Sequence, residues 1–202
     1  MPTTGDEPMT RIISGLAGGR RIHTPPGSGT RPTSDRVREA LFSRLEHLDV
    51  VNQGKVLDLY AGSGALGLEA ASRGATSVLL VESDWAAVAA VRKNIAELGL
   101  PGVTIRAETV ERVLLDGPPS HQARCDLVLA DPPYDVTEEA LSDVLGLLVT
   151  HEWLSEDAFV VVERSARSPE PRWPLGLDGA GERRYGETKM WFADFAGPPG
   201  VA

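Results

Sequence analysis

Apolar positions recur with two different periods along the chain, one typical of strands and one of helices. Between residues 55 and 163, short apolar runs alternate with segments whose apolar residues recur every three or four positions. The predicted strands are 55–60, 77–81, 103–107, 126–130 and 158–163, and the predicted helices are 65–73, 84–98, 110–115 and one capped by Thr137. This alternation indicates an α/β fold with a mostly parallel, doubly wound sheet.

The two ends of the chain have a different pattern. Residues 10–15 and 20–24 are short β-like runs around a glycine-rich turn and predict a small N-terminal hairpin. A Pro/Gly-rich segment follows, and then a helix that starts after Ser34 or Asp35 and continues to about His47. Residues 182–185 and 188–192 predict a final antiparallel hairpin. In the helix 84–98 we expect the inward face to consist of Trp85, Val88, Ile95 and Leu98.

A glycine-rich loop joins the first strand of the alternating region to its helix. Gly62, Gly64 and Gly67 have the G-x-G-x-x-G spacing of a dinucleotide site, and such glycines let a ligand approach the backbone. Asp58, however, ends the preceding strand, where a carboxylate would repel a pyrophosphate. The glycine loop together with Asp58 favours a cationic ligand such as S-adenosylmethionine. Glu82 at the end of the next strand is suited to the ribose hydroxyls of that ligand.

The apolar run 127–130 ends in Asp131-Pro132-Pro133-Tyr134. Two consecutive prolines cannot continue a central strand, because each lacks an N–H and fixes φ. The chain therefore leaves the sheet in a stiff conformation that carries one carboxylate and one aromatic ring. This arrangement suits a planar molecule with an amino group, such as a nucleic-acid base.

Composition and charge narrow the function classes. The 202 residues are 42% hydrophobic and 24% charged, with a single cysteine, Cys125, which we expect in the core. This usage excludes an intramolecular disulfide, and no Cys/His spacing indicates zinc. The net charge of −9 hides an excess of five positive charges in residues 9–45, leaving about −14 elsewhere. An anionic partner approached from one side is one interpretation; an Arg-rich solvated surface is the other.

These residues resemble a known family. Asp58, Gly62, Gly64, Glu82 and Asp131-Pro-Pro-Tyr134 are similar to the class I S-adenosylmethionine-dependent methyltransferases, in the form that acts on exocyclic amines. From about Thr10 to Phe195 the chain resembles the RsmD family, bacterial guanine-N2 methyltransferases of small-subunit (16S) ribosomal RNA. The matching segments are Arg11-Ile-Ile-Ser-Gly, Arg20-Arg21-Ile, 31–42 and 58–70.

The resemblance implies a Rossmann-like methyltransferase domain over 33–196, an RNA-binding hairpin and linker over 9–32, a disordered extension 1–8 and a flexible tail 197–202. Together with the residues at the strand ends and the basic N-terminal segment, it indicates three groups of site residues. The catalytic residues are Asp131, Pro132 and Tyr134; the cofactor-binding residues are Asp58, Ala61, Gly62, Gly64, Glu82, Ser83, Glu108, Thr109 and Asp131; the RNA-binding residues are Arg11, Arg20, Arg21, Arg31, Arg36 and Arg38.

The expected partner is 16S ribosomal RNA within a partly assembled small subunit. We expect the protein to be a cytoplasmic monomer that binds neither a metal ion nor a membrane. Arg183, Arg184 and Lys189 are further candidates for RNA contacts, although Lys189 is equally suited to a charge on a sheet edge. The alternatives are a DNA adenine-N6 methyltransferase, a protein glutamine methyltransferase, a dinucleotide-dependent oxidoreductase and an inactive RNA-binding module. Asp131-Pro-Pro-Tyr134 alone does not distinguish guanine from adenine.

Overall fold

The computed structural model describes residues 10–25 and 34–197. The extension 1–8, Arg31 and most of the linker and tail that the sequence predicts lie outside these ranges. Two elements form the N-terminal hairpin and the others follow in chain order: β1 Thr10–Arg11, β2 Arg21–Ile22, α1 Asp35–His47, β3 Lys55–Leu59, α2 Ala65–Ser72, β4 Ser77–Val81, α3 Trp85–Leu98, β5 Val103–Arg106, α4 Val110–Asp116, β6 Cys125–Ala130, α5 Glu138–Thr150, β7 Leu154–Ser165, β8 Leu177–Tyr185 and β9 Thr188–Phe195.

A single seven-stranded sheet organises the molecule, in the order β5-β4-β3-β6-β7-β9-β8. The first five strands in this order are parallel, and β9 pairs antiparallel with both β7 and β8. The predicted parallel sheet with a C-terminal antiparallel hairpin is thus confirmed. Chain order reverses between β3 and β6, which is where ligands bind in open α/β sheets, beyond the carboxyl ends of the strands.

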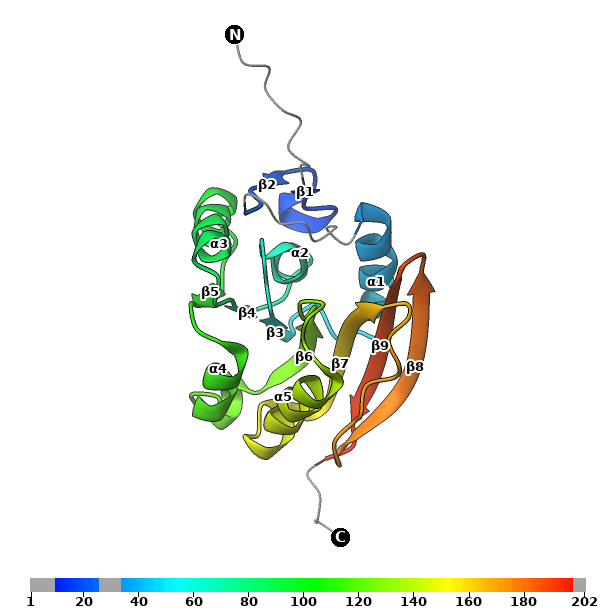
Figure 1. The fold of residues 1–202 in the computed structure, drawn as a ribbon. Helices are drawn as coiled ribbons and strands as arrows, with labels where there is room; N and C mark the ends of the chain where they lie inside the picture. Colours follow the sequence, from blue (N-terminus) through cyan, green and yellow to red (C-terminus); the bar gives the residue numbers. More distant parts are fainter. Residues whose placement is uncertain (1–9, 26–33, 198–202) are drawn as a thin grey trace.

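Two apolar cores cover the two faces of the sheet, and helices lie over both faces (Figure 1). Helices α1, α2 and α3 pack on one face together with Ile12, Ala17 and Ile22 of the N-terminal hairpin. Helices α4 and α5 pack on the other face. The side chains of the parallel strands β3 and β6 are buried on both faces, because each face is covered by helices.

The N-terminal hairpin has only two residues in each strand, and a 3₁₀ turn over Gly15–Ala17 lies between them. It is held by α2 rather than by its own strand pairing. The buried Glu69 carboxylate accepts hydrogen bonds from the amides of Ile13 and Ser14, at 2.7 and 3.0 Å. The Ser72 hydroxyl accepts from the Ala17 amide at 2.9 Å. The hairpin is therefore part of the helical layer.

Two expectations about side chains are wrong. Trp85 is 81% exposed, because it is the first residue of α3 and burial begins only at Ala87. Lys189 is not on a sheet edge: β9 is paired on both sides, and the Lys189 ammonium lies 3.0 Å from Glu182 and over the Trp191 ring. The edge strand is β8, which carries Arg183 and Arg184. Cys125 is buried as predicted.

Candidate active site

The register of the parallel strands brings the predicted site residues to one edge of the sheet. Leu59 of β3 pairs with Val81 of β4 on one side and with Ala130 of β6 on the other, and Ala130 pairs with Val162 of β7. Tyr60, Glu82 and Asp131 follow these positions and leave the sheet, whereas Glu163 stays in β7, which pairs with β9 as far as Ser165. Glu82, Asp131 and Glu163 are thereby aligned along the carboxyl edge.

The glycine loop follows β3 and starts with a left-handed backbone at Tyr60, whose φ is 60°. Such a conformation costs a non-glycine residue of the order of 1 kcal/mol and persists only where the surroundings hold it. Gly62 and Gly64 also have positive φ, at 57° and 80°. A side chain at Gly62 would meet nothing within 4 Å, so the backbone faces open space. At Gly67, in contrast, a Cβ would lie 2.3 Å from Leu80, and the glycine permits close packing of α2.

Asp58 is buried, with 1% of its surface exposed, and accepts a hydrogen bond from the Gly67 amide at 2.8 Å. Burial, and secondarily the Glu82 carboxylate, raise the pKa of Asp58 to about 7. The carboxyl thus fixes the first turn of α2 from below the loop. Its contact with a cofactor stays a prediction.

Glu82 is half-buried and uses both carboxylate oxygens. One accepts from the Gly62 amide at 2.8 Å, and the other accepts from the Ser83 and Asp84 amides at 2.8 Å each. It therefore ties the glycine loop to the start of α3. An ionised carboxylate has about four lone-pair sites, so Glu82 keeps the capacity to accept from a ligand diol. Ala61 is fixed in the same loop by its amide, which donates to Val81.

At the end of β5, Glu108 belongs to a cluster of charges. Its carboxylate is bound by Arg106 at 2.7 Å, and Arg106 also reaches Asp116 at 2.8 Å. Thr109 caps α4 by accepting from the Arg112 amide at 3.3 Å. Both residues lie at the carboxyl edge as the sequence predicts, and the adenine contact assigned to Glu108 stays a prediction.

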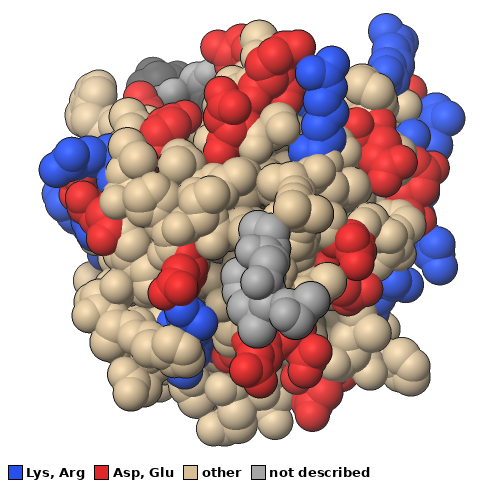
Figure 2. Space-filling view, turned by 90° about the horizontal axis from the view of Figure 1, so that it is seen from below, with Lys and Arg blue, Asp and Glu red and all other residues tan. Residues whose placement is uncertain are grey.

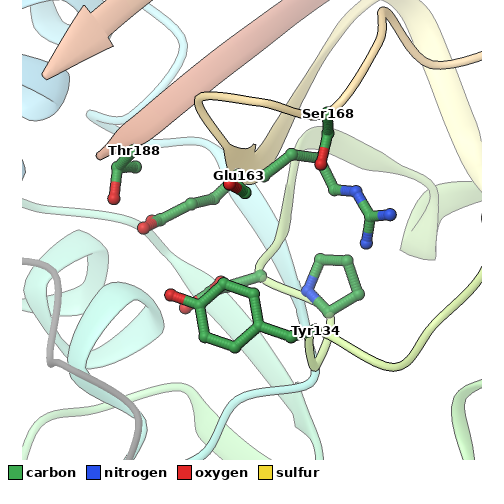
Figure 3. Close-up of a pocket in the computed structure, with 8 residues that line it drawn as sticks. Tyr134, Glu163, Ser168 and Thr188 are labelled. Atoms are coloured by element: carbon green, nitrogen blue, oxygen red, sulfur yellow. The ribbon is translucent and has the colours of Figure 1, made fainter. Parts of the chain in front are cut away.

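Asp131, Pro132 and Tyr134 line one pocket with residues of β7 and of the start of β9 (Figure 3). Pro132 is buried, whereas Asp131 is exposed at the pocket mouth and the Tyr134 side chain is 74% exposed. An exposed ring beside a carboxylate is suited to stacking on a planar ligand. Although the residue as a whole is exposed, the surroundings of its carboxyl group desolvate it, and this desolvation, followed by the carboxylates of Glu163 and Asp58, raises the pKa of Asp131.

Arg164 anchors the loop that carries Tyr134, a role that no motif in the sequence indicates. From β7 it donates to the Val136 carbonyl at 3.0 Å and to the Glu138 carboxylate at 2.5 Å, with only 8% of its side chain exposed. These bonds join the loop after Asp131 to the neighbouring strand. The pocket is therefore stiffened at both ends, by the two prolines and by Arg164.

The predicted RNA-binding arginines differ in how exposed they are and in what their side chains bind. Arg38 is wrong as a phosphate contact, because it is 1% exposed and its guanidinium donates to the Arg11 carbonyl and to Asp35. Arg20 donates to the Leu98 carbonyl at 2.9 Å and to the Glu97 carbonyl, at the end of α3. Arg11, Arg20, Arg21 and Arg36 are exposed, and their RNA contacts stay predictions. Figure 2, which views the molecule from below, shows acidic side chains interspersed with basic ones on that face.

The pocket and loop fit a bound S-adenosylmethionine. The backbone at Gly62 faces open space, and the surrounding side chains are carboxylates, which suit a sulfonium, an ammonium and a diol better than a pyrophosphate. Among the described residues no group of three His, Cys, Asp or Glu could hold a metal ion, and none of their helices is long and apolar enough to cross a membrane.

Sheet order and site define a class I methyltransferase fold. A *Salinibacter ruber* RNA methyltransferase bound to S-adenosyl-L-homocysteine shares this fold at 18% identity, with a TM-score of 0.60 over 85% of this chain and 97% of that one. The *Escherichia coli* protein yhhF superposes with a TM-score of 0.80 at 33% identity, over 94% of this chain and 99% of that one.

The family model "Conserved hypothetical protein 95" matches residues 10–194, and the chain belongs to this family, as its resemblance to RsmD predicts. Ribosomal RNA small subunit methyltransferase D of *Escherichia coli* is 35% identical, over 93% of this chain and 90% of the relative. The protein of the same name from *Haemophilus influenzae* is 37% identical, over 79% and 80%. The chain is a methyltransferase, and S-adenosylmethionine is its cofactor.

Proposed function

We propose that this protein transfers a methyl group from S-adenosylmethionine to the exocyclic N2 amine of a guanine in 16S ribosomal RNA of the small ribosomal subunit. One observation carries the proposal: the pocket of Asp131, Pro132 and Tyr134 lies at the carboxyl ends of β6 and β7, and β6 pairs with β3, whose carboxyl end leads into the glycine loop. The names of the relatives, which are ribosomal RNA small subunit methyltransferases, support an RNA substrate.

The chemical difficulty lies in the nucleophile, because an exocyclic amine is conjugated with its ring and its lone pair is a poor donor. The Asp131 carboxylate and the Pro132 carbonyl can each accept one N–H of this amine. Two fixed acceptors hold the nitrogen so that its lone pair points out of the ring plane. When bound, the cofactor supplies an electrophilic methyl group with a good leaving group. The stiff backbone at Pro132 and Pro133 supplies positioning and electrostatic stabilisation.

Each of the other pocket residues has a task in this mechanism. The exposed Tyr134 ring stacks on the base, and Arg164 holds the loop that carries the ring. Asp131 accepts or disperses the proton that the amine loses. A base inside a helix could not reach this pocket, so the target nucleotide is unpaired or flipped out. Arg11, Arg21 and Arg36 are exposed and suited to phosphate contacts, which orient RNA without selecting a sequence.

The proposal includes a cytoplasmic monomer that acts on a partly assembled subunit, since a small acidic protein has little surface of its own for sequence recognition. The remaining alternatives are a DNA adenine-N6 and a protein glutamine methyltransferase, because both amines fit the same pair of acceptors. The basic N-terminal segment favours RNA over a glutamine side chain, and the described residues contain no separate domain for reading the DNA major groove.

Labelled S-adenosylmethionine is the direct test. The protein is incubated with 16S RNA, with small ribosomal subunits and with DNA, and the products are digested to nucleosides. We expect label in N2-methylguanosine from RNA or subunits. Label in N6-methyladenosine, or in protein alone, would contradict the proposal.

A further inference from the structure

A second carboxylate shares the substrate pocket with Asp131. Glu163 lies on β7, and the pairing of Ala130 with Val162 places Asp131 and Glu163 one step further along two neighbouring strands. Both residues line the pocket. In Figure 3 the Glu163 side chain extends towards the space that the Tyr134 ring borders. The methyl-transfer mechanism uses only the first of these two acceptors.

The hydrogen-bonding edge of guanine accounts for the second acceptor. Guanine presents its N2 amine, the N1–H donor and the O6 acceptor in that order along one edge. Adenine presents a lone pair at N1 beside its amine. A carboxylate next to the group that binds the amine therefore stabilises guanine by one further hydrogen bond. Opposite adenine, the same carboxylate would meet the N1 lone pair, and two acceptors would face each other.

We propose that Glu163 is the residue that selects guanine, by accepting the N1–H of the base whose N2 amine is held by Asp131 and Pro132. This inference rests on the proposed function and adds a base-reading residue to it. It also explains how a pocket whose Asp-Pro-Pro-Tyr motif suits any exocyclic amine can reject adenine. A site built to bind an N–H discriminates strongly against an analogue that lacks it.

The strand next to β7 supplies the group needed for the third position on the guanine edge. Thr188, the first residue of β9, pairs with Ser165 and lines the same pocket. Figure 3 shows its side chain on the same side of the pocket as Glu163. A hydroxyl can donate to the O6 carbonyl. Across β6, β7 and β9 the pocket thus presents acceptor, acceptor and donor, which matches guanine from N2 to O6.

The test changes a hydrogen-bond donor to an acceptor in the base and, in a variant, an acceptor to a donor at residue 163 of the protein. The labelled guanosine is first located in the RNA by mapping labelled nuclease fragments. It is then replaced in synthetic RNA by 2,6-diaminopurine riboside, which keeps the N2 amine but has a lone pair at N1. The wild-type protein should methylate the guanosine RNA with a kcat/KM at least about tenfold above that of the diaminopurine RNA. In Glu163→Gln the side-chain amide can donate to N1, so the ratio should fall at least about tenfold.

Glu187→Gln is the matched control, because Glu187 is exposed near the same strand end and does not line the pocket. It should leave the ratio unchanged. Cofactor affinity and Tm of Glu163→Gln should stay close to wild type, which separates base selection from a structural role. A ratio that is unchanged in Glu163→Gln, or no discrimination by the wild type, would overturn the inference while guanine methylation stands. Failure of the wild type to methylate the guanosine RNA would overturn the proposed function itself.

Discussion

The carboxyl edge of the sheet and the N-terminal segment, residues 10–25 with α1, both contain charged residues that the sequence marks as functional. At the sheet edge, Glu82 and Asp131 stay where a ligand can approach, because the strands end there. In the N-terminal segment, Arg38 is buried, and Arg20 is exposed but donates to carbonyl oxygens at the end of α3. The charges of the N-terminal segment thus include some that the fold uses to dock the hairpin.

The difference has a physical origin in what holds each region. The sheet edge is built on backbone pairing, which leaves side chains at its end available. The N-terminal segment has almost no strand pairing of its own and needs side chains to dock it. Asn94 of α3 is buried and exchanges hydrogen bonds with the His23 backbone, and it also donates to the Ser63 carbonyl of the glycine loop at 2.9 Å. Docking the hairpin and ordering the cofactor loop therefore share one residue.

The largest effect is expected at Asp131. Asp131→Ala removes one of the two acceptors that orient the amine, and kcat should fall about 10³-fold or more. Cofactor affinity should change little, because the glycine loop is ordered by Asp58 and Glu82. Single-turnover rates and calorimetric titration with S-adenosylmethionine measure the two quantities. Asp135→Ala, which changes an exposed carboxylate of the same loop, is the control; loss of cofactor binding in Asp131→Ala would assign Asp131 to the cofactor instead.

For the N-terminal segment the largest effect is expected in stability. The buried Glu69 accepts from two backbone amides and from Arg73 at 2.7 Å, and Arg73 also binds Glu39 and Glu46 of α1. Glu69→Ala leaves a buried guanidinium without its central partner and should cost about 3 kcal/mol of unfolding free energy. Denaturant unfolding measures this loss, with the exposed Glu139→Ala as control. Equal midpoints for the two variants would show that the hairpin needs no such anchor.

A third prediction separates Arg11, Arg21 and Arg36 from Arg20 and Arg38, whose guanidinium groups donate to backbone carbonyls. Replacing Arg11, Arg21 and Arg36 by alanine should weaken RNA binding about tenfold and lower the slope of log K against log salt by up to about three. Filter binding over a range of salt concentrations gives both values. A triple change of Arg112, Arg167 and Arg172, all exposed elsewhere, is the matched control. If replacing Arg11, Arg21 and Arg36 leaves the slope unaltered, the N-terminal charges form a solvated surface and do not contact phosphates.

The smallest effect concerns pH. Desolvation and the carboxylates of Glu163 and Asp58 raise the pKa of Asp131, and the amine is held by the ionised form. Methyl transfer should therefore fall as pH decreases through a pKa above the ordinary carboxyl range. Glu163→Gln removes one of these charges and should move this acid limb to lower pH, by up to about one unit. The pH dependence of kcat for both proteins tests the shift, and coinciding profiles would contradict the coupling.

Much of the fold could be predicted from the sequence, because apolar periodicity distinguishes strands from helices and glycines mark the turns between them. Gly62 and Gly67 illustrate what spacing can and cannot tell. Their G-x-G-x-x-G pattern predicts a strand-loop-helix turn, but only the structure shows that Gly62 faces open space while Gly67 packs against Leu80. The predicted burial of Trp85 is wrong for a related reason. Helical periodicity does not show at which residue of a helix the contact with the core begins.

The sequence by itself determined the sheet, its final hairpin, the glycine loop and the stiff turn at Asp131, since each follows from local backbone preferences and apolar patterning. Only the tertiary structure decided which charges remain available. Arg38 contacts Arg11 and Arg73 contacts Glu39 and Glu46, all far away in the chain. Glu163 joins Asp131 because β6 and β7 pair in one register. Such long-range partners are set by strand order and helix packing, which leave no local mark in the sequence.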